Sequence, residues 1–154
     1  MYNTKSGREI SFYGIETSSN IKPISNDYKI NDLKELFEIL LNVWDDKTVS
    51  PGCLPVYNNE NDPSKGQCTI TAMLVQDIFG GTIRRIHVGM GTHSLNEING
   101  EFYDLASDQF KVMNIPLNYE ENEIADREKL NEDDNVYKRY LLLRDKVLES
   151  VKDR

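Results

Sequence analysis

Apolar side chains recur at helical spacing in residues 31–46, 68–79 and 135–153. Asn31 stands where the first of these helices would take an N-cap. Two glycines follow the second stretch at once, and such a pair is a common helix stop. The pattern therefore predicts three helices, each with one apolar face turned to a core.

Between the second and third stretches the chain reads as strands. We expect strands at "TIRRIHV" (82–88), "THSLNEI" (92–98) and "EFYDLAS" (101–107). The last two are joined by Asn99-Gly100, the strongest short hairpin signal. The order helix, long loop, helix, three antiparallel strands, helix predicts an α+β fold, with helices packed on a small antiparallel sheet.

The remaining segments lack a clear period. Residues 1–30 are polar and turn-rich apart from one candidate strand in "REISFYGI", so we expect a poorly ordered or loosely packed N-terminal arm. Residues 31–154 then form a single α+β domain. Residues 47–65 hold three prolines, and this long loop is expected to border a site. The acidic residues of 118–135 indicate a solvated connector, with an acidic docking surface as the alternative.

Composition narrows the function classes. A chain of 154 residues with 38% apolar and 29% charged residues is typical of one globular domain. The net charge of −8 argues against nucleic acid and anionic membrane as partners, because both need clustered basic side chains. No apolar run has the length of a membrane span, and the first residues lack the apolar region of a signal peptide. We therefore expect a cytoplasmic protein with two reduced thiols. The sequence specifies no oligomeric state.

The first turn of the second helix carries a thiol, Cys68. Unpaired N–H groups and the helix dipole favour thiolate there, and thiolate is the nucleophilic form. Gly66 would let a substrate approach the backbone, while the Gln67 side-chain amide and the Cys68 N–H would bind a developing oxyanion. The alternative is a buried cysteine that only packs, since free cysteine is among the most buried residue types.

The hairpin register brings a histidine and a carboxylate together. With a two-residue turn, Ile98 faces Glu101, and counting back makes His93 and Asp104 diagonal neighbours on one face. Such neighbours lie about 7–8 Å apart, within reach of an imidazole and a carboxylate. Asn96 points to the other face. A slip of one residue would reverse this arrangement. As read, the hairpin supplies a base and its orienting carboxylate, and with the helix thiol they make a Cys-His-Asp triad.

The other candidate groups predict no further site. His87 lies inside a strand and is interpreted as a satisfied strand histidine. Cys53 lies in the long loop as a bystander or rim residue. The chain has no CxxC or HxxxH spacing, so we expect no metal, and no phosphate loop or GxGxxG, so we expect no cofactor.

The stretch "GQCTITAMLVQDIFGGTIRR…GTHSLNEINGEFYDLASDQF" resembles the YunG-like family of small bacterial proteins of unassigned function. The family pattern is a GQC helix ending in QD-aromatic-GG, a His with an Asn three residues on, DG, and DL-x-x-x-QF. The resemblance covers roughly residues 35–148. The chain departs from it at Ser94-Leu95, where the family usually has aromatics, and at Ala106, where it has Thr. The matching residues are Gly66, Gln67, Cys68, Thr71, Ala72, Gln76, Asp77, Phe79, Gly80, Gly81, His93, Asn96, Gly100, Asp104, Leu105, Gln109 and Phe110.

The order of these groups also resembles, in layout alone, the core of transglutaminase-like and papain-like thiol enzymes. The resemblance implies a Cys68 nucleophile, with His93 moving the proton and Asp104 orienting the ring. The expected substrate is a peptide or a small amide, contacted by Gly66 and Asn96, and the reaction is hydrolysis or acyl transfer. The alternative is a non-catalytic binding or regulatory domain on the same scaffold, since fold analogy does not assign a reaction.

Overall fold

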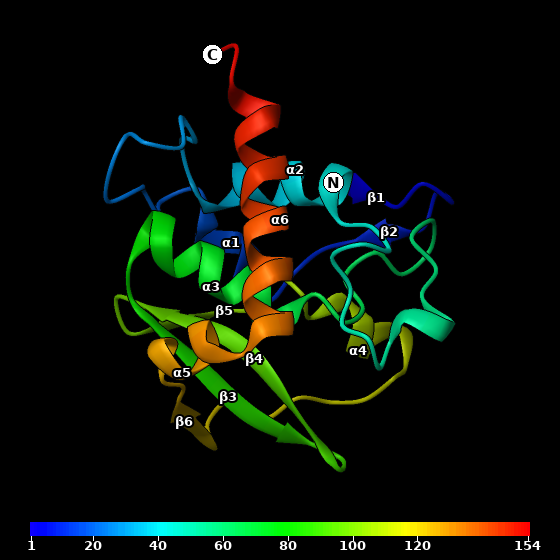
Figure 1. The fold of residues 1–154 in the computed structure, drawn as a ribbon. Helices are drawn as coiled ribbons and strands as arrows, with labels where there is room; N and C mark the ends of the chain where they lie inside the picture. Colours follow the sequence, from blue (N-terminus) through cyan, green and yellow to red (C-terminus); the bar gives the residue numbers. More distant parts are fainter.

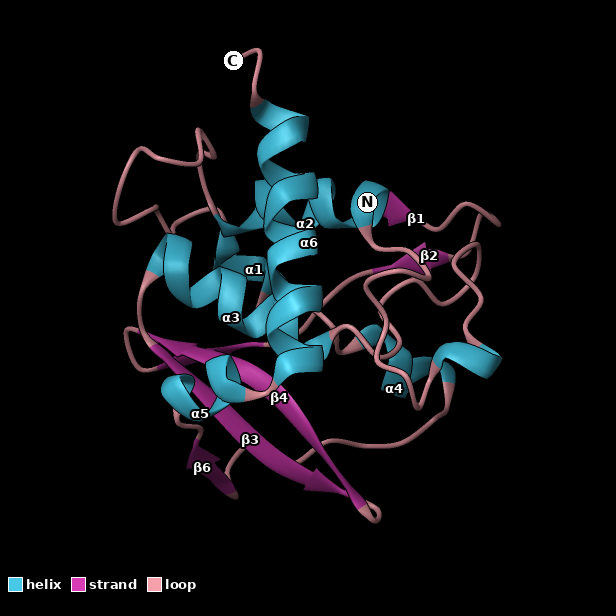
Figure 2. Cartoon of the chain, viewed as in Figure 1, coloured by secondary structure: helices cyan, strands magenta, loops and turns pink.

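In the computed structural model, which describes residues 1–154, a four-stranded antiparallel sheet lies below a group of helices (Figure 1; Figure 2 separates helices from strands by colour). Helix α3 packs on strands β3 and β4, and α6 packs on both α3 and α2. The helices are α1 (Ile15–Ser18), α2 (Leu33–Val43), α3 (Cys68–Phe79), α4 (Asp108–Val112), α5 (Arg127–Glu132) and α6 (Asp134–Val151), with a 3₁₀ turn η1 (Leu54–Val56). The strands are β1 (Tyr2–Asn3), β2 (Glu9–Ile10), β3 (Thr82–Val88), β4 (Gly91–Ile98), β5 (Glu101–Tyr103) and β6 (Asn122–Ile124).

The three long helices lie where their apolar periods predict them. The N-cap of α2 is Asp32 rather than Asn31, because the Asp32 carboxylate accepts a hydrogen bond from the Glu35 N–H at 2.8 Å. The Glu35 carboxylate in turn accepts from the Asn31 N–H, which completes a reciprocal cap. None of the helices is long and apolar enough to cross a bilayer.

The three predicted strands are present, and a fourth completes the sheet. Its order is β5-β4-β3-β6, with β6 adding to the free edge of β3. The predicted hairpin register is confirmed, since Ile98 pairs with Glu101 and Asn96 pairs with Tyr103. Strand β5 is shorter than expected because the chain leaves β4 after Tyr103, and Asp104 bridges to Tyr13 instead.

The N-terminal segment is part of the core, which differs from the loosely packed arm expected for residues 1–30. Ile10, Phe12, Ile21 and Ile30 are buried in the same apolar cluster as the long helices. Arg8 also makes a bidentate ion pair with the buried carboxylate of Asp108 in α4, at 3.0 and 2.6 Å. Ile10 and Phe12 alternate at strand spacing within the candidate strand "REISFYGI", where β2 forms, but Ile21 and Ile30 follow no helix or strand period, so sequence periodicity could not reveal the burial of these two.

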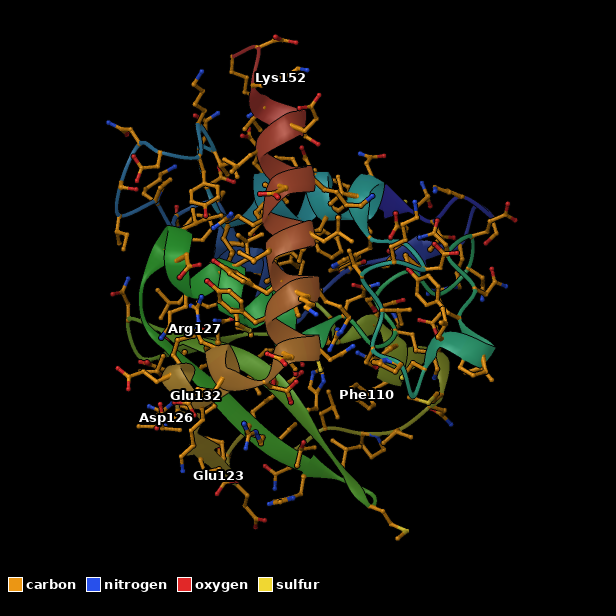
Figure 3. All side chains as sticks on the ribbon, in the orientation of Figure 1. Phe110, Glu123, Asp126, Arg127, Glu132 and Lys152 are labelled. Carbon is orange, nitrogen blue, oxygen red and sulfur yellow. The ribbon has the colours of Figure 1, made fainter.

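The acidic segment 118–135 carries two short elements, β6 and α5, on which its acidic side chains stay exposed. Arg127 fixes α5 to α3 through an ion pair with Asp77 at 2.7 Å. Figure 3 places Glu123, Asp126 and Glu132 at the β6 side of the sheet, well apart from Phe110 at the other side. These three acidic residues therefore lie apart from Phe110 and the helix α4 that carries it.

Candidate active site

Cys68 is the first residue of α3, and the residue is half-buried. The N-cap residue of α3 is Gln67, and its side chain makes no capping hydrogen bond to the first turn. The N–H groups of the first turn, which have no partner within the helix, therefore stay available near the thiol. This end of α3 can stabilise negative charge on the sulfur or on a bound oxygen.

His93 on β4 and Asp104 after β5 lie side by side, as the hairpin register predicts. Nε2 of His93 lies 2.7 Å from Oδ2 of Asp104, and each side chain is 1% exposed. The backbone N–H of Asp104 donates to the Tyr13 carbonyl oxygen at 3.0 Å. Because Asp104 is held by this bridge as well as by the hairpin, its carboxylate has a fixed position against the ring.

The protonation of His93 follows from its partners. Burial alone would lower the pKa of the imidazole, but the charge of Asp104, the hydrogen bond to it and the contact with Cys68 together raise the pKa to about 10. The ring is therefore an imidazolium at neutral pH. Asp104 accounts for most of this increase.

The pKa of the Cys68 thiol is shifted in the opposite direction to that of His93. Burial alone would raise the pKa of Cys68, but hydrogen bonding to His93 and its positive charge, the Ser94 N–H and the Thr69 hydroxyl together hold that pKa below the ordinary value. Asp104 engages Nε2, and Nδ1 of His93 is buried without a hydrogen-bond partner. Nδ1 is therefore the ring nitrogen that can exchange a proton with the thiol. The arrangement favours a thiolate–imidazolium pair.

Gln67 and Gly66 contact the chain that precedes α3, Gln67 through a hydrogen bond and Gly66 through close packing. The Gln67 side chain is fully buried, and its Nε2 donates to the Asp45 carbonyl oxygen at 3.1 Å. Gly66 has a φ of 71°, and a Cβ there would lie 2.6 Å from Cγ2 of Val49. The close approach that Gly66 permits is therefore made by the protein's own loop. The oxyanion role of Gln67 and the substrate contact of Gly66 stay predictions.

The structure sets the other candidate residues apart from the sulfur. Asn96 is buried on the α3 face of the sheet, where its Nδ2 donates to the Ala72 carbonyl oxygen at 2.9 Å. His87 is exposed and lies 4.0 Å from the Glu123 carboxylate. Cys53 is a free thiol in the loop, packed against Gly66. No three His, Cys, Asp or Glu side chains converge in a way that could hold a metal ion.

Three residues around the triad were not singled out as site residues from the sequence. The Tyr119 hydroxyl donates to Oδ2 of Asp104 at 2.7 Å, on the oxygen that His93 also uses. Phe110 packs edge-on against the His93 ring, with centroids 4.6 Å apart. The Gln109 side chain accepts from the Gly66 N–H at 3.3 Å and so ties α4 to the chain leading into α3. The "QF" pair of the family pattern was a signal for the last two, whereas Tyr119 had none.

Comparison with known proteins relates the chain to an uncharacterised protein and to one protein family. Residues of the chain are 46% identical over 61 positions to the uncharacterised protein YunG of Bacillus subtilis. This match covers 40% of the chain and 50% of the relative, so the chain spans about half the length of the curated relative that it matches. No solved structure matches the chain significantly. The sequence pattern of the YunG protein family, by contrast, matches residues 32–152, and the chain belongs to the YunG family.

Proposed function

We propose that the protein is a cysteine-dependent hydrolase or acyl transferase that acts on a peptide or another amide, on a transglutaminase-like or papain-like core. The observation that carries the proposal is the buried 2.7 Å contact of His93 with Asp104, beside a thiol whose pKa is lowered at a helix N-terminus. A histidine that serves only for packing needs neither a charged partner nor a free ring nitrogen next to a sulfur.

The first half-reaction forms a thioester. The Cys68 thiolate attacks the amide carbon, a C–S bond forms, and the carbonyl π electrons move to the oxygen. When the tetrahedral intermediate collapses, the C–N bond breaks and the amine leaves with the proton from Nδ1 of His93. Because the pKa of His93 is about 10, the ring carries this proton at neutral pH. Asp104 keeps Nε2 engaged, so the ring presents Nδ1 throughout.

The second half-reaction releases the acyl group. Nδ1 of His93, now neutral, accepts a proton from water or from an amine, whose oxygen or nitrogen attacks the thioester carbon. The C–S bond breaks, the thiolate of Cys68 is regenerated and the imidazolium returns. Water as acceptor gives hydrolysis, and an amine gives transfer.

The oxyanion of both intermediates needs hydrogen-bond donors near the sulfur. The Cys68 N–H, at the uncapped start of α3, is the first donor. The second donor in this proposal is the Gln67 amide, which must then give up its hydrogen bond to the Asp45 carbonyl oxygen when substrate binds. Substrate binding is thereby connected to Asp45, which lies between α2 and the loop of residues 47–65.

The test uses p-nitrophenyl acetate, an activated ester that reports acylation directly. We expect a stoichiometric burst of p-nitrophenol, an acetyl adduct on Cys68 detected by mass spectrometry, and slower turnover afterwards. The burst should disappear in Cys68→Ser and persist in Cys53→Ser, which is the matched control for a thiol outside the site.

His93→Ala separates catalysis from simple thiol chemistry. In the proposed enzyme this change slows both acylation and deacylation, because no group carries the proton. Equal labelling of Cys53 and Cys68, or an adduct on Cys68 that forms as fast in His93→Ala as in the wild type, would refute the proposal. Either result would favour a binding domain with an unused thiol.

A further inference from the structure

An open cavity of about 970 Å³ lies next to His93 and Asp104, since its lining residues Phe110 and Tyr119 contact them. Its walls come from the segment after β2, from β5, and from α4 with the chain that follows it. Neither Cys68, His93 nor Asp104 lines it. The lining residues are Ser11, Phe12, Tyr13, Phe102, Ser107, Asp108, Phe110, Lys111, Asn114, Ile115, Pro116, Leu117, Asn118, Tyr119 and Glu120.

The walls are rich in aromatic rings. Phe12, Tyr13, Phe102, Phe110 and Tyr119 all reach the cavity. Tyr119 stands at the centre of this set, with its ring centroid 4.4 Å from that of Tyr13 and 6.2 Å from that of Phe102. Aromatic walls of this kind bind flat apolar molecules, because the rings provide large contact area with little loss of side-chain entropy.

The mouth of the cavity exposes apolar side chains to water. Tyr13 is 52% exposed and Ile115 is 39% exposed, and the neighbouring Val112 and Met113 are each 40% exposed. Burial of such a cluster by an occupant is favourable at about 25 cal/mol per Å² of apolar surface. Exposed apolar surface around a concave site is typical of binding sites rather than of bare protein surface.

Two of the polar groups that remain unpaired on the wall are hydrogen-bond donors. The Lys111 ammonium forms no ion pair, and the Ser107 hydroxyl accepts from the Tyr13 N–H without donating in turn. The carboxylate of Asp108 is already neutralised by Arg8. Glu120 is the one unpaired anion at the rim. An occupant that satisfies these donors carries an acceptor of negative charge.

We propose that this cavity binds a small molecule with a flat aromatic body and an anionic group, with the body against the aromatic rings and the anion near Lys111. The occupant contacts two residues that also touch the triad. Tyr119 donates to Oδ2 of Asp104, and Phe110 packs on the ring of His93. The site is separate from the proposed thiol chemistry, and its test does not depend on a reactive Cys68.

The test uses 8-anilinonaphthalene-1-sulfonate, an aromatic anion whose fluorescence rises in apolar surroundings. We expect one saturable site on the folded protein. Lys111→Ala should weaken binding about two- to fivefold and Glu120→Gln should tighten it by a similar factor, since exposed charge pairs contribute about 0.2–1 kcal/mol. The neutral analogue N-phenyl-1-naphthylamine should bind the two variants and the wild type alike. Lys138→Ala, an exposed lysine outside the cavity, is the charge control.

A blocking variant tests the location. Ser11 lines the cavity between two buried residues and makes no side-chain hydrogen bond, so Ser11→Trp should fill the space and weaken both probes about tenfold or more. Ser19→Trp, on the exposed end of α1, is the matched control. Near-ultraviolet circular dichroism must stay native, because partly folded states also bind the sulfonate probe. Binding that is absent, that Ser11→Trp leaves unchanged, or that ignores both charge variants would overturn the proposal.

Discussion

Nε2 of His93 lies 2.7 Å from Oδ2 of Asp104, and the two side chains come from opposite arms of one hairpin. Because Asn99-Gly100 fixes the register, the contact depends on a turn of two residues. The Asp104 carboxylate has no other charged partner at this contact, so its negative charge acts mainly on the imidazole and raises the pKa of His93.

Cys68 should alkylate with iodoacetamide at a pH well below the ordinary thiol pKa of about 8.5, because its pKa is lowered by the His93 imidazolium. Cys53, which lies outside the His93–Asp104 pair, is the internal comparison. Peptide mass spectrometry across a pH series measures both thiols in one sample. Identical profiles for the two cysteines would exclude the thiolate–imidazolium pair.

Turnover of an amide or ester should have an alkaline limit that alkylation lacks. As the pH rises through about 10, His93 loses its proton while Cys68 remains a thiolate. Alkylation needs only the thiolate and should stay on its plateau, whereas turnover also needs the proton for the leaving group and should fall. Parallel pH profiles of acetyl release and iodoacetamide labelling test this, and coincident alkaline limbs would contradict the assigned roles.

Asp104→Asn should weaken the pair without unfolding the protein. The amide removes the charge that raises the pKa of His93, and an opposite charge at this distance shifts a pKa by about 1–3 units. The imidazolium is then lost at lower pH, and the alkylation midpoint of Cys68 should rise by about one unit. Labelling profiles of variant and wild type measure the shift. A midpoint that does not move would show that Asp104 has only a structural role.

Asn96→Ala provides the contrast from the other face of the hairpin. Asn96 donates to the Ala72 carbonyl oxygen inside the fold, so its loss should reduce the free energy of unfolding by about 1–3 kcal/mol. The alkylation profile of Cys68 should be nearly unchanged. Urea unfolding and labelling of the same sample separate the two effects. A larger profile shift here than in Asp104→Asn would make Asn96 the third member of the site.

The helices and strands with a regular spacing of apolar residues could be predicted from the sequence, whereas the elements of only a few residues could not. The bounds of α3 and β3 follow from apolar spacing and from the glycines that stop them. Strand β6 has three residues within an acidic stretch, and only its pairing with β3 makes it a strand. The burial of Ile21 and Ile30 likewise depends on residues distant in sequence, which no local pattern encodes.

The same division holds for the candidate site. Cys68, His93 and Asp104 could be identified because a helix start and a hairpin turn place them by local geometry. Tyr119 lies in a chain segment without a period, and its position comes from packing against Ile86 and Leu95. The hydrogen bond from Tyr119 to Asp104 could therefore not be predicted from the sequence, although it is a second hydrogen bond to the same carboxylate oxygen that His93 contacts.

Gly66→Ala should destabilise the protein and disturb Cys68. The backbone there has a φ of 71°, and the added Cβ would lie 2.6 Å from Cγ2 of Val49 and 2.9 Å from Cβ of Cys53. Backbone strain and overpacking together should cost about 2–4 kcal/mol in urea unfolding. Gly52→Ala is the matched control in the same loop, since nothing lies within 4 Å of its added Cβ. Equal free energies of unfolding for the two variants would mean that Gly66 is not tightly packed against Val49 and Cys53.

The loop of residues 47–65 is expected to border the substrate entrance. The Ser50 N–H donates to the Gly66 carbonyl oxygen at 2.9 Å, two residues before Cys68, while Leu54 and Val56 in η1 remain exposed. A ligand bound to the thiol should order this loop, so proteinase K should cut within 47–65 more slowly after Cys68 is labelled with a peptidyl chloromethyl ketone. Cutting in the exposed segment 24–27 serves as the internal control and should keep its rate. Peptide mapping by mass spectrometry gives both rates. If cutting within 47–65 is unchanged while labelling of Cys68 is complete, the loop does not border the entrance, and substrate recognition belongs to the strands and α4.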